Sequence, residues 1–354
     1  MFTIIYLYIL VICLGIVAYF SLDRKCDRTT VLIGSLLLFL FLLLFATFRN
    51  GDVLPDYQAY CKMFASQTES KTVEQSFYFI KKISNSLCQN NVLVLFFIYA
   101  LLGITTKYYA IRKYSTYQPF SIFVWCCSFY LLEDMIQIRA SVAGGLLMLL
   151  IPRIAQRKWH FAVLLFLLAF TFHNSAIVFL VVFFLNPFRI NVKFWFIGYL
   201  LALFVNILNV DFYGIINFLL RLIPSDFVSS RFYIYIMRDY YNVGGRVTMY
   251  SPYTLLQTIV CLFLLWRVNF IKEVSPYVII WLKVGFISLY IYSLSIPGVT
   301  MRLSELLSVV HVFLMPLLID AVPYRYRYYG GVSVIILGLL ILSNFIFFQH
   351  FVYL

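Results

Sequence analysis

Charged residues are scarce in this chain. Only 12% of the 354 residues are Asp, Glu, Lys or Arg, and 63% are hydrophobic. Soluble domains usually carry roughly 25% charge, and no polar stretch here is long enough to form one. The whole chain, residues 1–354, is therefore predicted to be one integral membrane domain. Because backbone groups in lipid must be satisfied within their own segment, we predict an all-α helical bundle.

Several enzyme motifs are missing as well. The chain contains no phosphate-binding loop, dinucleotide-binding fingerprint or nucleophile elbow. Its seven cysteines lack the spacing of a metal site, and most fall in apolar runs, where cysteine acts as a small buried hydrophobe. Cys61 and Cys88 share one polar segment and could pair if it is extracytoplasmic. We expect no metal and no cofactor.

Apolar runs are what the sequence has in abundance. Runs of about 18–20 residues recur from end to end, and a helix of that length crosses roughly 30 Å of hydrocarbon. They predict a polytopic membrane protein with about 12 transmembrane helices. The predicted helices are approximately 1–20, 30–48, 92–110, 119–132, 138–152, 159–172, 175–188, 194–210, 254–271, 277–296, 303–319 and 331–349. Two long connections separate them, near 49–91 and 211–253.

The charges predict an orientation. The first apolar run, Phe2–Phe20, has no basic residue before it but is followed by Arg24, Lys25 and Arg28. That order is the reverse of a secretory signal peptide, so the N-terminus is expected outside. The short inner connections then collect most basic residues, Lys107 among them, and both long connections lie outside the cytoplasm. The net charge of +13 is an orientation signal under this interpretation, and no nucleic-acid partner is expected.

Two pairs of predicted helices are too short for full crossings. Trp159–Phe188 must hold two antiparallel helices in 30 residues, whereas two full crossings need roughly 40. The turn between them, Phe172–Ala176, is therefore expected below the outer surface. Pro119–Pro152 presents the same problem, with "EDMIQIRAS" at its turn. Two recessed turns predict a cavity open to the outside.

Ionisable groups at the outer ends of these helices are costly to place and so are candidate site residues. The stretch "FRNGDVLPDYQAY" supplies Arg49, Asp52, Asp56 and Tyr57. A snorkelling arginine and solvated acids are the simpler interpretation. Pro55 stiffens the backbone just before Asp56, which favours Asp56 over Asp52 as a carboxylate held in a fixed place.

The stretch "QIRASVAGG", Gln137–Gly145, opens a later helix with an arginine. It contains two overlapping pairs of small residues four positions apart, so this helix is predicted to pack closely against a neighbour. Arg139 is then held on a rigid element, and its planar fork suits the oxygens of a phosphate. An interfacial anchor is the alternative.

A histidine and a third arginine stand at two other helix starts. Asn174 or Ser175 can cap the helix after His173, and the helix dipole favours a neutral imidazole that could act as a base; a hydrogen-bonded histidine in a polar turn is the alternative. Arg302 and Glu305 are three residues apart, which suits an intrahelical ion pair. If Glu305 instead orients Arg302, the pair forms a second phosphate clamp.

The second long connection is rich in tyrosine and arginine. These side chains could line the membrane interface, their commoner role, or stack on sugar rings and hold phosphates. The candidates for sugar contacts are Arg231, Tyr233, Tyr240, Tyr241 and Arg246.

The order of these motifs resembles the EpsG-like, Wzy-type polymerases of O-antigen and exopolysaccharide. "FRNGDVLPDYQAY" is similar to that family's Arg-Gly-spacer-Asp-Tyr-x-x-Tyr signature, and "QIRASVAGGLLML", "FHNSAIVFL" and an Arg/Tyr-rich segment follow in order. One departure is that Asp52 and Val53-Leu54-Pro55 replace the usual glycine-rich spacer. The question of which of Asp52 and Asp56 matters more stays open.

The resemblance implies a metal-independent glycosyl transfer on the outer face of the bacterial cytoplasmic membrane. A growing glycan on undecaprenyl pyrophosphate would move onto a sugar hydroxyl of an incoming lipid-linked repeat unit. The implied partners are that lipid-linked oligosaccharide, the bilayer, a chain-length regulator and a repeat-unit flippase.

Roles for the candidate residues follow from this chemistry. Arg139 and Arg302, with Arg49, would hold the pyrophosphate, and Asp56 or His173 would take the acceptor proton. Tyr57 is a further candidate for sugar contact.

The alternative functions are a flippase of lipid-linked units, which is a transporter, and an O-antigen ligase. A transporter would be expected to show internal repeats and mid-membrane charges.

Overall fold

The computed structural model describes residues 2–23, 28–49, 51, 54, 56–68, 73–88, 91–208, 210, 212, 249, 251–296 and 299–348. Every regular element in that part of the chain is helical, and it contains no strand. The elements through α10 are α1 (Phe2–Phe20), α2 (Arg28–Thr47), α3 (Tyr57–Ala65), α4 (Gln75–Cys88), α5 (Val92–Tyr114), α6 (Gln118–Trp125), the π-helix η1 (Cys126–Ile136), α7 (Ile138–Ala155), α8 (Trp159–Phe172), the 3₁₀-helix η2 (Asn174–Phe179), α9 (Leu180–Phe183) and α10 (Val192–Ile207).

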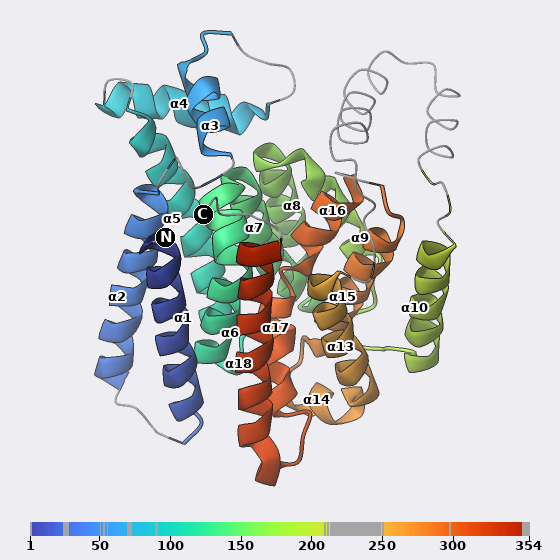
Figure 1. Ribbon diagram of the computed structural model, residues 1–354. Helices are drawn as coiled ribbons and strands as arrows, with labels where there is room; N and C mark the ends of the chain where they lie inside the picture. Colours follow the sequence, from blue (N-terminus) through green and yellow to red (C-terminus); the bar gives the residue numbers. More distant parts are fainter. Residues whose placement is uncertain are drawn as a thin grey trace.

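The remaining elements complete the bundle. They are α13 (Pro252–Trp266), α14 (Val268–Val274), α15 (Val278–Ser293), α16 (Val299–Ser308), α17 (His311–Leu314), η3 (Met315–Ile319), η4 (Tyr324–Tyr326), α18 (Arg327–Ser343) and η5 (Asn344–Phe348). Most helices run side by side along one direction, and α3 and α4 lie together at one end of the bundle (Figure 1).

The lengths of the helices support a membrane protein. Five described helices are long and apolar enough to cross a membrane, or six if the pair α13 and α14, bent by 87°, counts as one span. The five are Val92–Tyr114, Gln118–Ile136, Ile138–Ala155, Val299–Ile319 and Tyr324–Phe347. Shorter apolar helices cover the other predicted segments. The number of about 12 crossings, taken from the length that a span requires, stays a prediction.

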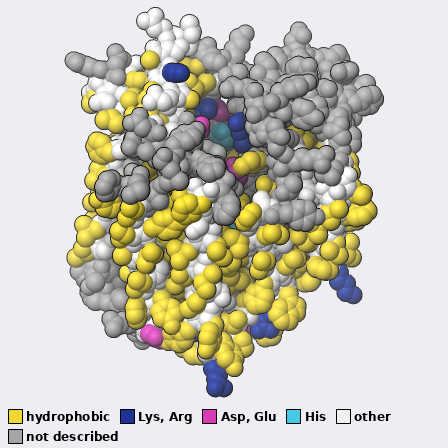
Figure 2. All heavy atoms as spheres, viewed as in Figure 1, with side chains coloured by type: hydrophobic (Ala, Val, Ile, Leu, Met, Phe, Trp, Pro, Cys, Tyr) yellow, Lys and Arg dark blue, Asp and Glu magenta, His cyan; other side chains and the backbone are white. Residues whose placement is uncertain are grey.

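The outward faces of the peripheral helices are apolar. Leu37 of α2, Leu164 of α8 and Leu201 of α10 each expose about 60% of their surface (62%, 61% and 60%). Yellow hydrophobic side chains cover much of the visible bundle, while most of the charged side chains in view lie near its two ends (Figure 2). Such a surface is suited to lipid, because hydrocarbon presents no polar groups for hydrogen bonding.

The predicted close packing of the small-residue helix is confirmed. Helix α7 packs against α5, and a Cβ added to Gly103 of α5 would collide with the hydroxyl of Ser141. A Cβ on Gly145 of α7 would collide with Thr106 of α5. The two backbones therefore approach closely only because glycine stands at these contacts.

The first long connection folds into two helices rather than an extended loop. Tyr60 of α3 stacks on Phe77 of α4 with ring centroids 6.4 Å apart, and it meets Phe96 of α5 edge-on at 6.4 Å. Phe77 and Ile80 are buried. These aromatic contacts fix α3 and α4 onto the end of α5.

The turn predicted at "EDMIQIRAS" is mostly helical in the structure. "EDMIQIRAS" was predicted as a turn, but its first four residues belong to the π-helix η1, and Gln137 alone separates η1 from α7. The helix therefore continues in π form through Ile136, and the turn before α7 is one residue long.

The five sugar-contact candidates of the second long connection, Arg231, Tyr233, Tyr240, Tyr241 and Arg246, lie outside the described residues. Asp52 of the first long connection lies outside them too.

Candidate active site

Three segments meet at the carboxylate of Glu74, which directly precedes α4. Glu74 accepts a hydrogen bond from the guanidinium of Arg139, in the first turn of α7. Its Oε1 atom lies 3.5 Å from Nδ1 of His173 and accepts the backbone N–H of Asn174 at 3.2 Å. The Glu74 side chain is only 4% exposed. One buried carboxylate therefore joins α4, α7 and the turn after α8.

The electrostatics of Glu74 follow from these contacts. Burial by itself opposes its ionisation, but the close approach of the His173 ring and the positive charge of Arg139 outweigh that effect and lower the pKa of Glu74 to about 2. The carboxylate is thus ionised across the physiological range. It is a permanent negative charge between an arginine and a histidine.

Asp56 lies in the same electrostatic environment. It occupies the N-cap position of α3. Burial raises the pKa of Asp56, and the positive charges of Arg302 and Arg139 partly oppose that rise. Acidic, basic and histidine side chains gather in a hollow at the α3–α4 end of the molecule (Figure 2). Asp56, His173, Arg139 and Arg302, predicted from four separate motifs, therefore belong to one region.

Arg302 and Glu305 lie one turn apart on α16. Glu305 is buried, feels the charge of Arg302 and hydrogen-bonds Gln137, the residue between η1 and α7. The predicted orienting residue thus contacts the turn that leads directly to Arg139. The carboxylate connects α16 to the start of α7.

Arg49 is turned into the protein. Its Nη1 donates to the backbone carbonyl of Met135 at 2.6 Å, and its guanidinium lies 4.6 Å from the ring centroid of Phe96. The side chain is buried. These contacts hold the end of η1 close to Arg139, while the predicted contact between Arg49 and a phosphate stays a prediction.

Two tyrosines of α3 flank the site. Tyr57 stacks on Phe96 with ring centroids 5.0 Å apart, so its sugar contact also stays a prediction. The Tyr60 ring lies 5.8 Å from the guanidinium carbon of Arg139, within cation–π range. Tyr60 was not among the predicted site residues. It supports the Arg139 side chain from the α3 side.

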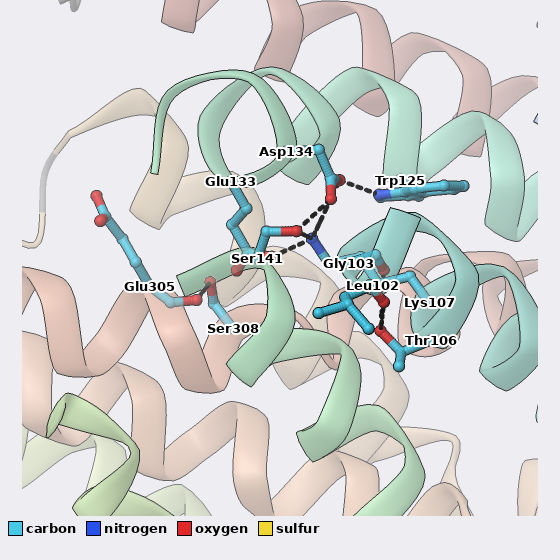
Figure 3. Close-up of polar contacts among 10 residues, drawn as sticks. All are labelled: Leu102, Gly103, Thr106, Lys107, Trp125, Glu133, Asp134, Ser141, Glu305 and Ser308. Carbon is cyan, nitrogen blue, oxygen red and sulfur yellow. Dashed lines mark hydrogen bonds and ion pairs between the residues drawn. The ribbon is translucent and has the colours of Figure 1, made fainter. Parts of the chain in front are cut away.

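A buried charged cluster lies among α5, α6, η1 and α7 (Figure 3). Lys107, expected in an inner connection, is instead fully buried in α5. Its Nζ lies 2.6 Å from Glu133 and 3.0 Å from both carboxylate oxygens of Asp134. Nζ also donates to Ser141 at 3.2 Å, and the indole of Trp125 donates to Asp134 at 2.9 Å. That expectation was wrong because Glu133 and Asp134 of η1 supply the negative charges that pair with a lysine inside the bundle.

This cluster also reaches the active-site segments. Lys107 bonds Asp134, five residues before Arg139, and Ser141, two residues after it. Glu133 in turn feels the negative charge of Glu305. Lys107 of α5 therefore holds the chain on both sides of Gln137, the residue at which η1 ends and α7 begins.

In the described part of the chain, no three His, Cys, Asp or Glu residues are arranged to hold a metal ion.

Sequence reasoning missed Glu74 and the cluster for different reasons. Glu74 stands in a polar connection, where nothing in the pattern separates a buried acid from a solvated one. Lys107, Glu133 and Asp134 did carry a signal, because charges inside or beside apolar runs need partners. Their pairing depends on which helices become neighbours.

The fold and this region define a polytopic helical membrane protein with a charged site at one end of its bundle. A family model described as "EpsG family" matches residues 32–354. The chain belongs to the EpsG family, which indicates a polysaccharide-polymerase-like membrane protein. Comparisons with curated proteins and with solved structures gave no match.

Proposed function

We propose that the chain is a Wzy-type polysaccharide polymerase of the bacterial inner membrane. It transfers a growing glycan from undecaprenyl pyrophosphate to a sugar hydroxyl of an incoming lipid-linked repeat unit, with the α3–α4 end facing the cell exterior or periplasm. The convergence of Arg139, Arg302, Asp56, His173 and Glu74 at one end is the observation that carries this proposal. Such a polymerase works beside a repeat-unit flippase and a chain-length regulator.

The reaction needs cations and a base. The bond between the donor sugar C1 and the pyrophosphate oxygen breaks, the acceptor oxygen bonds to C1, and its proton leaves to a base. Arg139 and Arg302 stabilise the departing pyrophosphate. His173 is the favoured base, because Glu74 lies against Nδ1 and orients the ring, which leaves Nε2 as the other nitrogen for the acceptor hydroxyl. Asp56 is the second choice.

A transporter of lipid-linked repeat units is the second candidate function. The buried Lys107–Glu133–Asp134 cluster favours it, since ionisable groups inside a membrane often mark transport pathways. The cluster has another explanation here, because it braces the segment that carries Arg139. A ligase would use the same pyrophosphate contacts.

A deletion strain analysed by glycan ladder tests these functions. Loss of a polymerase leaves lipid anchors capped with a single repeat, whereas loss of a flippase leaves none. Loss of a ligase leaves polymer on undecaprenyl pyrophosphate. A plasmid carrying Arg139→Ala should fail to restore the ladder, and full restoration would contradict the proposed pyrophosphate contact.

A further inference from the structure

The α3–α4 unit contains a cavity of about 600 Å³ that the proposed reaction does not use. This volume falls within the range typical of ligand sites, roughly 300–1,000 Å³. The cavity lies between the C-terminal end of α3 and one face of α4. Its lining residues are Phe64, Ala65, Ser66, Gln67, Thr68, Tyr78, Lys81, Lys82 and Asn85.

The lining is cationic and rich in hydrogen-bonding groups. Lys81 and Lys82 contribute positive charge, and none of the nine lining residues is acidic. Lys81 is held in place, because its Nζ donates to the carbonyls of Ser66 at 2.5 Å and Met63 at 3.4 Å. Lys82 is exposed. An anionic ligand would therefore meet one fixed and one adaptable cation.

One polar atom in the lining has no partner. The Oδ1 atom of Asn85 is shielded from solvent and accepts no hydrogen bond within the described chain. A buried acceptor left unsatisfied is costly, and a ligand hydroxyl would satisfy it. Tyr78 and Phe64 add aromatic surface to the same cavity. The ligand that matches this lining carries hydroxyls, a flat apolar face and a negative charge, and an acidic sugar has all three.

The cavity and the candidate active site share the helices α3 and α4 but lie towards opposite ends of α3. Helices α3 and α4 begin next to Asp56 and Glu74, and the stacked pair Tyr60 and Phe77 lies between their first turns. Tyr78 follows Glu74 by four residues, a distance of about 6 Å along a helix. A glycan with its reacting end near Arg139 would reach the cavity by running along the nine residues of α3, a length of about 14 Å.

We propose that this cavity binds a carboxylate-bearing sugar residue of the glycan, along the chain from the reacting end. The identity of the ligand as the substrate glycan rests on the proposed function; the cation-lined cavity does not. The strain's surface polysaccharide should accordingly contain a uronic acid or another carboxylated sugar. A repeat unit without a carboxylate overturns the proposal.

Binding is tested with oligosaccharides released from that polysaccharide and with the same oligosaccharides after chemical reduction of their carboxyl groups. The full-length chain is held in phosphatidylcholine nanodiscs. We expect the acidic form to bind at least tenfold more tightly than the reduced form, and Lys82→Gln to remove that preference. Lys62→Gln, an exposed α3 lysine outside the cavity, should keep it. Equal affinities for both forms, or equal effects of the two variants, overturn the proposal.

Two further measurements separate the alternatives. Nanodiscs containing phosphatidylglycerol should leave oligosaccharide binding unchanged, whereas competition by this lipid assigns the cavity to a headgroup and overturns the proposal. In the complemented deletion strain, Lys82→Gln should shorten the glycan ladder and Lys62→Gln should not. If the deletion itself leaves the ladder intact, the proposed function fails, while the binding preference still reports on the cavity.

Discussion

Glu74 and Arg139 lie 65 residues apart in the sequence, yet the carboxylate of Glu74 accepts a hydrogen bond from the guanidinium of Arg139. The same carboxylate approaches the His173 ring at 3.5 Å. Because each of these residues stands at the end of a different helix, this contact fixes three helix ends relative to one another. It converts separate polar motifs into one site.

Replacing Glu74 should remove part of the pH dependence of the protein's stability. The folded-state pKa of about 2 lies below the ordinary value of 4.5, so the stabilisation is complete above 4.5 and is lost as pH falls towards 2. Glu74→Gln should therefore lower the melting temperature at pH 7, by an amount equivalent to at most about 3 kcal/mol. The gap to the wild type should narrow below pH 4.5 and close as pH falls through about 2. Thermal unfolding in detergent measures this, and the exposed Glu273→Gln is the control. An equal gap at both pH values would contradict the assignment.

Replacing Arg139 tests the phosphate contact. Arg139→Lys keeps the charge but removes the planar fork that matches phosphate oxygens. We expect polymerisation to fall at least about 100-fold, the usual effect of losing one donor to a developing anion. The exposed Arg112→Lys on α5 should retain full activity. Repeat-unit transfer by purified protein is the assay, and near-normal activity of Arg139→Lys would show that charge alone suffices.

The two candidate bases differ in their expected rate losses. His173→Gln should slow transfer about 10²- to 10⁴-fold, the usual contribution of a general base, and Asp56→Asn should slow it less. Burial raises the pKa of Asp56 above 3.8, so the effect of its negative charge on the rate should be lost as pH falls through that raised value. Asp56→Asn should not show this decline. A larger loss in Asp56→Asn than in His173→Gln would make Asp56 the base.

Neutralising Lys107 should destabilise the protein through its buried partners. Lys107→Met leaves the Asp134 and Glu133 carboxylates without their cation, and breaking a buried pair in this way costs about 3–5 kcal/mol. Adding Asp134→Asn should recover part of the loss, because one uncompensated charge is removed. Melting temperature is the readout, with the exposed Lys113→Met as control. No recovery in the double variant would contradict the pairing in Figure 3.

The α5–α7 contact predicts opposite outcomes for two glycines. Gly103→Ala places a methyl group against Ser141 and close to Asp134, so it should force the two helices apart and reduce both stability and activity. Gly34→Ala on α2 meets nothing within 4 Å and should be neutral or slightly stabilising, since alanine favours helices by about 1 kcal/mol over glycine. Melting temperatures in detergent compare the two. Similar losses would show that the contact is not decisive.

The candidate site could be predicted only in part. Arg139, His173, Asp56 and Arg302 stand beside long apolar runs, where a charged or polar residue is visible against its surroundings. Glu74 has no such contrast, because it lies in a polar connection. Its burial appears only when α4 folds over the ends of α7 and α8.

The sequence alone determined that this chain is a helical membrane protein of the EpsG type, because apolar runs and the ordered motifs are local features that need no knowledge of neighbours. Only the tertiary structure decided which charges meet. Lys107 and its two acids were assigned to opposite sides of the membrane, yet they pair inside the protein. Contacts between distant residues depend on helix packing, and the close approach of α5 and α7 at Gly103 and Gly145 is what brings Lys107 to Asp134.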